Sequence, residues 1–225
     1  MNAAFFNIET TERIQDGVPI DRLPLACAAV HLIEYRGNYN SFPIRKTITT
    51  DNLELLKICF DFSHAIVGFN VKAFDYTVLW KYYEDELIDE WRAKTLDVMD
   101  LVTREFGRCP SLNTLAQYTI GYERKLDWKR AEDLWRKGEC DAMINYCHED
   151  VRMTRDIFDY GMVHGIVRTL NHEAKDLEEK DLEAEHLEEI DARTWMWELN
   201  NKMERDIAER RLDVSRVPPI DSIER

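Results

Sequence analysis

The stretch that decides the fold is Ala3-Ala4-Phe5-Phe6-Asn7-Ile8-Glu9-Thr10-Thr11, which lies almost at the first residue of the chain. Successive side chains of a strand point to opposite faces, so a strand here places Asn7 and Glu9 on one face and Phe6 and Ile8 on the other. Taken alone, such a polar pair is typical of many strand ends. The rest of the chain must supply partners before the pair indicates a site.

The residues that follow predict an antiparallel meander. Gly17, Pro19 and Pro24 mark a loop after the first strand. The apolar run 25–33 suits a buried second strand, and residues 42–50 suit a third.

Further along, helices alternate with short apolar strands. Residues 65–70 form an apolar run that ends at a polar residue, and Thr95 to Val102 fits another core element. The predicted helices are 51–60, Ala73 to Glu86, Ser111 to Gly121, Lys129 to Lys137 and Cys140 to about Met162. This order predicts an α/β fold in which helices flank a mixed β-sheet.

The composition changes past His172. Residues 173–191 hold ten acidic and two basic residues, and their leucines are spaced by five, so we predict a solvated helix or a flexible connector there. Beyond Ile190, the spacing of Met196, Leu199, Met203 and Ile207 predicts a helix that docks on the domain or pairs with another chain. We therefore divide the chain into a domain at 1–170 and a charged, acidic helical extension at 171–225.

The net charge and the cysteines limit the classes of function that the sequence allows. A net charge of −14 argues against a broad basic nucleic-acid surface, but residues 172–225 carry −8 of it, and metal-binding carboxylates would add to the remainder. No apolar run is long enough for a membrane span, and no secretory signal is visible. Five scattered cysteines indicate reduced thiols in a cytoplasmic, intracellular protein.

Two further stretches carry acidic residues where a strand or helix can present them. In the stretch 67–75, Asn70 ends a strand and Asp75 falls in the first turn of the next helix. In the stretch 145–151, Tyr146 and Asp150 are four residues apart and share one face of a helix. A phenolic hydroxyl thus lies one turn from a carboxylate.

With the opening strand, these stretches resemble the three motifs of the DEDD-type 3′–5′ exonucleases of the ribonuclease-H-like superfamily, in their tyrosine variant. The three matches are Phe5 to Thr10, Gly68 to Asp75 and Tyr146 to Val151. The pattern is most similar to the exonuclease domains of family-B DNA polymerases and their stand-alone relatives. Asp97 and the run 111–116 also stand where such proteins carry similar segments, and the resemblance extends to about Leu170.

The resemblance implies a two-metal phosphodiesterase using two Mg²⁺ or Mn²⁺ ions, held by carboxylate oxygens. Carried over, Asn7 would bridge both ions, while Glu9 and Asp150 would hold the ion that activates water. Asp75 would support the second ion, and Tyr146 would orient the attacking water. Thr10, Asn70 and Phe74 are the candidates for contact with the 3′-terminal nucleotide, although Phe74 also suits the core.

Asn7 is the departure from the pattern, because the family has an aspartate there. A neutral amide cannot bridge two cations as a carboxylate does, so we expect very low catalysis. The asparagine is either an engineered inactivation, which the four intact positions favour, or the mark of a natural protein that has lost activity.

Other residues have competing interpretations. His148 would point off the face of Tyr146 and Asp150, which favours a surface or packing role. Lys125, Trp128 and Lys129 could contact a phosphate backbone or a base, and a structural role suits them equally.

The sequence therefore predicts a metal-dependent 3′–5′ exonuclease acting on single-stranded DNA or RNA 3′ ends, with DNA favoured and cutting disabled at Asn7. The alternative is a non-catalytic module that binds nucleic-acid ends or a partner protein. A third hypothesis is a scaffold that self-associates or binds a protein partner through its tail, without membrane contact.

Overall fold

The computed structural model describes residues 1–12, 17–36, 39–108, 110–122, 124, 128–170 and 187–212. Within them, six strands form the main sheet, and two more form a separate antiparallel pair. The strands of the main sheet are β1 (Asn2–Thr10), β2 (Leu25–Arg36), β3 (Tyr39–Asn40), β4 (Ile44–Ile48), β5 (Ala65–Gly68) and β6 (Thr95–Asp97). The separate pair consists of β7 (Ile166–Leu170) and β8 (Leu187–Asp191).

The main sheet is mixed, as the sequence predicts. Its order is β3-β2-β1-β5-β6, and β4 also pairs with β2. The strands β1, β2 and β4 pair antiparallel and form the expected meander, while β5 and β6 continue the sheet in parallel with β1. The pairing of β1 with β5 covers only Ala3 to Phe5, so the second half of β1 extends past the end of β5.

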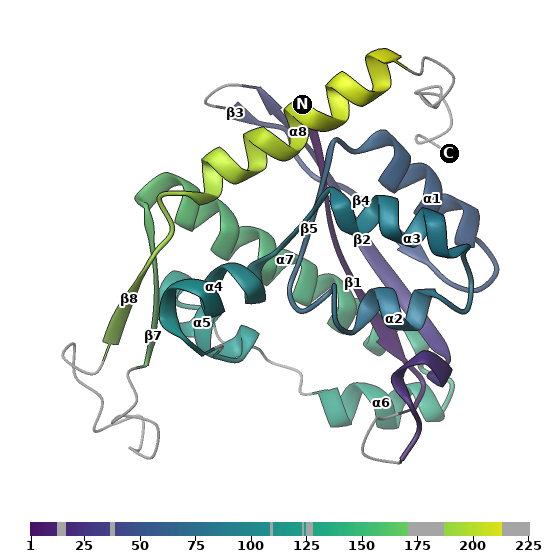
Figure 1. Ribbon diagram of the computed structural model, residues 1–225. Coiled ribbons are helices and arrows are strands. Elements are labelled where there is room, and N and C mark those ends of the chain that lie inside the picture. The colour runs from purple at the N-terminus through teal and green to yellow at the C-terminus, as the bar shows by residue number, and fades with distance from the viewer. Residues whose placement is uncertain are drawn as a thin grey trace.

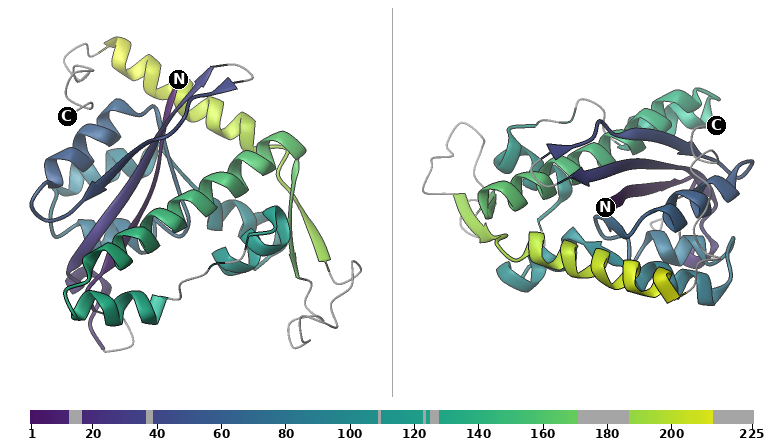
Figure 2. Two further views of the ribbon diagram at one scale, coloured as in Figure 1. Left: turned by 180° about the vertical axis from the view of Figure 1, so that it is seen from behind. Right: turned by 90° about the horizontal axis from the view of Figure 1, so that it is seen from above.

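Helices cover both faces of this sheet. They are η2 (Ile20–Arg22, a 3₁₀ turn), α1 (Leu53–Phe62), α2 (Asp75–Leu79), α3 (Asp85–Ala93), α4 (Val98–Phe106), α5 (Leu112–Ile120), α6 (Trp128–Arg136), α7 (Cys140–His164) and α8 (Trp195–Leu212). One face packs against α1, α2 and α3. The long helix α7 runs across the other face, over β1 and β2, as the view from behind shows (Figures 1 and 2).

The first strand contributes to both layers because its apolar side chains alternate. Phe6 meets the ring of Phe60 on one face, with ring centroids 4.8 Å apart. Phe5 meets Phe158 of α7 on the other face, at 5.8 Å. Both phenylalanines are buried, and a buried side chain of this size contributes roughly 1.5–3 kcal/mol. Their packing fixes which face of β1 each following side chain occupies.

Several predicted helix ends are confirmed. Ser111 is the N-cap of α5, because its hydroxyl accepts a hydrogen bond from the amide of Thr114 at 3.1 Å. Gly121 ends this helix in the left-handed conformation, with φ of 65°.

The prediction of a single helix over Ala73 to Glu86 is wrong. The structure has two short helices here, α2 and α3, with residues 80–84 between them. The interruption lets two tyrosines reach backbone partners on other elements. The Tyr82 hydroxyl accepts from the Leu25 amide at 3.1 Å, and the Tyr83 hydroxyl donates to the Leu53 carbonyl at 2.7 Å. These tertiary contacts outweigh the helical periodicity of the segment.

The expected acidic helix or connector is wrong at its end, because residues 187–191 form the strand β8, which pairs with β7. Its alternation buries Ile190, whereas the leucine spacing of five suits no helix. The rest of that acidic segment, residues 173–186, lies outside the described residues. Helix α8 follows as predicted, but Trp195, Leu199 and Met203 form its buried face, while Met196 is 40% exposed.

No helix among the described residues is both long and apolar enough to cross a membrane. Of the five cysteines, the four within the described residues have free thiols (Cys27, Cys59, Cys140 and Cys147).

Candidate active site

Asn7 and Glu9 lie in the half of β1 that extends past β5, on the face that α7 covers. The Asn7 amide donates to Glu9 Oε1 at 3.1 Å and to the Sγ of Cys147, on α7, at 3.7 Å. In return, the Cys147 thiol donates to the Asn7 carbonyl at 3.2 Å. Glu9 is 7% exposed, so this carboxylate lies almost entirely beneath the helix.

Asp75 reaches the same end of β1 from the first turn of α2. Its Oδ1 accepts the backbone N–H of Ile8 at 2.8 Å, beyond Phe5, where the pairing of β1 with β5 ends. The side chain is buried, and burial raises the pKa of the Asp75 carboxyl. The hydrogen bond from Ile8 opposes this shift, whereas the charges of Glu9 and Asp97 add to it.

Tyr146 and Asp150 lie one turn apart on α7, as the sequence predicts, and both side chains contact Arg124. Burial raises the pKa of the Asp150 carboxyl, the charge of Arg124 lowers it, and Glu9 and Glu149 raise it again. Glu9 therefore acts electrostatically on both Asp75 and Asp150. We call the three carboxylates Glu9, Asp75 and Asp150 the acid cluster.

Arg124 is the partner that sequence reasoning missed. Its guanidinium donates to Asp150 Oδ1 and lies over the Tyr146 ring, with Cζ 4.2 Å from the ring centroid. The basic and aromatic residues that the sequence suggests near this position are Lys125, Trp128 and Lys129. Lys125 lies outside the described residues, and Lys129 is exposed. No spacing rule identifies Arg124, because its partners come from elements far along the chain.

Asp97 fixes the conformation of the loop that precedes Asp75. Its carboxylate accepts the backbone amides of Asn70 at 2.7 Å, Lys72 at 3.0 Å and Met99 at 3.0 Å. The loop is tight at Gly68, where an added Cβ would lie 2.2 Å from Val71. The sequence marked Asp97 only by resemblance, and the structure gives it a positioning role.

The three residues proposed for substrate contact are dispersed around this loop and strand end. Thr10 is buried, and its hydroxyl donates to the Glu12 carbonyl at 2.7 Å. Asn70 has a positive φ of 62°, at the turn that Asp97 holds. Phe74 is partly buried against the core on the α2 side, as its alternative interpretation expects.

His148 is a packing residue, as expected. It stacks on His31 of β2, with ring centroids 5.3 Å apart and a hydrogen bond of 3.0 Å between the rings. Its other ring nitrogen bonds to the Thr47 hydroxyl at 2.8 Å. Burial lowers the pKa of His148 and lowers that of His31 to about 3. We call His31 and His148 the histidine pair.

The donor set does not fit a pair of divalent ions as it is arranged. Among the described residues, no group of three or more His, Cys, Asp or Glu side chains is placed to hold a metal ion. Asn7 presents an N–H to Glu9, and a guanidinium already binds Asp150. Hard dications require several oxygens that converge on one point.

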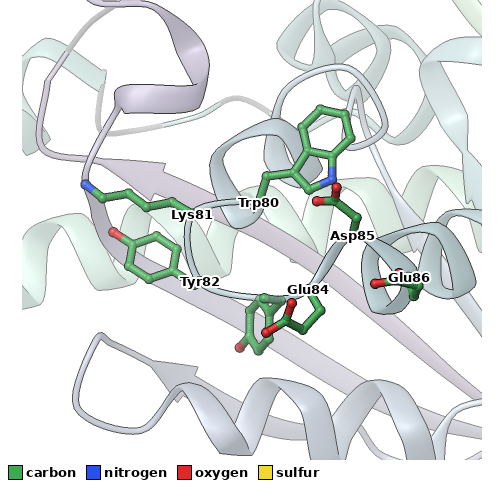
Figure 3. Close-up of a pocket in the computed structure, with 7 residues that line it drawn as sticks. Trp80, Lys81, Tyr82, Glu84, Asp85 and Glu86 are labelled. Atoms are coloured by element: carbon green, nitrogen blue, oxygen red, sulfur yellow. The ribbon is translucent and has the colours of Figure 1, made fainter.

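A surface pocket lies apart from this site. It has a volume of about 530 Å³ and is lined by residues 80–86, between α2 and α3 (Figure 3). Glu84, Asp85 and Glu86 make its lining acidic, and none of the predicted site residues lines it. It gives no support to a nucleic-acid groove.

Comparisons with known proteins agree with this fold. A family model described as the RNase H superfamily matches residues 4–161. Among solved structures, the chain is similar to the family B DNA polymerase from the hyperthermophilic archaeon Pyrobaculum calidifontis, at 16% identity and a TM-score of 0.50. The likeness covers 72% of this chain and 24% of the polymerase chain, and it concerns the fold alone. No curated protein matches the sequence.

Proposed function

This chain belongs to the RNase H superfamily, and we propose that it is a 3′–5′ exonuclease-type domain whose cutting is disabled at Asn7. Its ligand would be the 3′ end of a single-stranded nucleic acid, with DNA favoured over RNA. The observation that carries the proposal is the electrostatic coupling of Glu9 with both Asp75 and Asp150, with Asp75 bound to the backbone of β1 and Asn7 bound to Glu9.

The chemistry of the site supports impaired hydrolysis. Mg²⁺ or Mn²⁺ is the cofactor that the resemblance implies, and it would supply charge stabilisation at the phosphate. The Asn7 amide has no negative charge, and its N–H points at Glu9. The raised pKa of Asp75 and of Asp150 also opposes metal binding, since metal ligands must be deprotonated. We therefore expect the chain with Asn7 to bind ends and to cut them very slowly.

The test uses a short single-stranded oligonucleotide with a 5′ fluorescent label. Fluorescence anisotropy should show tighter binding to a free 3′ hydroxyl than to a 3′-blocked strand, by about tenfold, or 1.4 kcal/mol. The Asn7→Asp protein with millimolar Mn²⁺ should shorten the labelled strand stepwise from its 3′ end. Equal affinity for free and blocked ends, together with an inactive Asn7→Asp protein, would contradict the proposal. DNA and RNA strands of the same sequence decide the preference.

The second candidate is a non-catalytic module that binds ends, with Asn7 as its native residue. The hydrogen bond from Asn7 to Glu9 and the pairing of Asp150 with Arg124 favour it, since both carboxylates already have partners. Preserved 3′-end binding in a chelator, with no cutting by Asn7→Asp at any Mn²⁺ concentration, would identify this function.

A further inference from the structure

Arg124 is almost fully buried among acidic side chains. Its side chain is 7% exposed, although the residue stands in the connection between α5 and α6. It pairs with Asp150, which is itself 14% exposed, and Glu9 also acts on it electrostatically. Burying a guanidinium is costly unless carboxylates compensate for the lost water. The acid cluster is that compensation, and Arg124 in turn offsets the charge of the cluster.

The position of the guanidinium matters because of what surrounds it. It contacts Asp150 and is within range of the charge of Glu9, and these are the two residues that the resemblance assigns to the ion that activates water. It also covers the ring of Tyr146, at 4.2 Å from Cζ to the ring centroid. A cation from the chain thus lies among the residues proposed to surround a divalent ion.

The fit of the guanidinium is incomplete. Arg124 Nε is buried and has no hydrogen-bond partner among the described residues. An unsatisfied buried donor weakens the hold of the site on this side chain. A dication carries twice its charge, so it can displace the guanidinium if the carboxylates are numerous enough. With Asn7 in place of a carboxylate, the site lacks one of the charges that would favour such an exchange.

We propose that the Arg124 guanidinium occupies the place of one divalent ion and excludes that ion from the site. This inference rests on the proposed function, because it takes Glu9 and Asp150 as the ligands of that ion. Arg124 and Asn7 then act together: the amide lowers the negative charge of the site, and the guanidinium neutralises part of what remains. Restoring the carboxylate alone should restore metal binding only in part.

Arg152, also on α7, provides a matched control. Its guanidinium lies over the ring of Tyr122, 4.4 Å from the centroid, and pairs with Glu149 at 3.8 Å. The pair reproduces the arrangement of an arginine, a tyrosine and a carboxylate, but the Arg152 side chain is 38% exposed. Its removal should change surface charge without opening the site.

The experiment measures Mn²⁺ binding to the full chain by isothermal titration calorimetry. Arg124→Gln should bind Mn²⁺ more tightly than the wild type by about tenfold or more, the scale on which groups around a metal change its affinity. Asn7→Asp/Arg124→Gln should bind more tightly than either single variant. Arg124→Lys, which keeps the charge, and Arg152→Gln should resemble the wild type. Unchanged affinity in a folded Arg124→Gln protein, or an equal gain in Arg152→Gln, would overturn the proposal.

A second measurement leaves Arg124 in place, in case the glutamine variant does not fold. In Asn7→Asp labelled with ¹⁵N, titration with Mg²⁺ should shift the Nε–H signal of Arg124 and leave that of Arg152 unchanged. A saturating ion that leaves the Arg124 signal unmoved would show that the ion and the guanidinium occupy different places. Failure of the proposed function has a different signature, because it appears as lost preference for a free 3′ end whatever the metal affinity.

Discussion

The acid cluster and the histidine pair each include a residue of α7, and they stabilise buried polar groups in opposite ways. The histidine pair is neutral, and its members bond to each other and to Thr47. The acid cluster holds three carboxylates and depends on Arg124 and on the amide of Ile8. A buried neutral pair carries no charge that needs compensation, whereas buried like charges need a cation. The demand for a cation distinguishes the acid cluster from the histidine pair.

The largest change in stability is expected when Arg124, the partner of Asp150 in the acid cluster, is replaced. Arg124→Gln removes one partner of a buried ion pair, so the free energy of unfolding in the absence of metal should fall by about 3 kcal/mol. Chemical denaturation measures this change. Adding Asp150→Asn should recover most of the loss, because the unpaired charge is then gone. Equal stability of the single and double variants would show that Arg124 does not compensate for Asp150.

The second largest change in stability is expected when Asp75, another member of the acid cluster, is replaced. Asp75→Ala leaves the amide of Ile8 buried without its acceptor, which should cost about 2 kcal/mol. Asp75→Asn keeps an acceptor oxygen and should cost clearly less, as judged by the same denaturation curves. If the two substitutions are equally destabilising, the carboxylate acts through its charge and not through this hydrogen bond.

The histidine pair should make the free energy of unfolding depend on pH. The pKa of His31 is lowered from 6.5 to about 3 by burial, aided by the charge of His148. Below pH 6.5 the unfolded chain takes up a proton that the folded chain refuses, so stability falls as the pH falls. From pH 6.5 to about pH 5 the loss should reach about 2 kcal/mol. His31→Gln should lack this loss when unfolding is measured across that range.

The acid cluster changes the stability with pH in the opposite direction to the histidine pair. The raised folded-state pKa of Asp75 and of Asp150 means that their contribution to stability is greatest at low pH and is lost as the pH rises. Only the difference between His31→Gln and the wild type therefore reports on His31. A difference that does not change with pH would exclude the histidine pair as a titrating element.

The smallest effect is expected far from both clusters. Trp197 is 67% exposed on α8, and Trp197→Gln should change the free energy of unfolding by less than about 0.5 kcal/mol. Light scattering on the same protein examines the hypothesis of self-association through the tail. A smaller species than the wild type would support self-association, and an unchanged mass would count against a contact through this residue.

Local patterns in the sequence were sufficient for much of the fold. The alternation in β1 predicted the faces of Phe6, Asn7, Ile8 and Glu9, because a strand has a period of two residues. The caps at Ser111 and Gly121 predicted the ends of α5, because they depend on neighbouring backbone groups. The prediction of one helix over Ala73 to Glu86 was wrong, because Tyr82 and Tyr83 bind distant backbone groups that a periodic pattern cannot reveal.

By itself, the sequence determined the strand that carries Asn7 and Glu9, the order of the three acidic segments, and the amide of Asn7 beside the carboxylate of Glu9. These are properties of residue type and spacing, which need no knowledge of distant contacts. Only the tertiary structure decided that Asp75 would bind the amide of Ile8 and that Arg124 would enter the acid cluster. The reason is physical: a buried charge takes the partner that the fold brings within reach, however far apart the two lie in the chain.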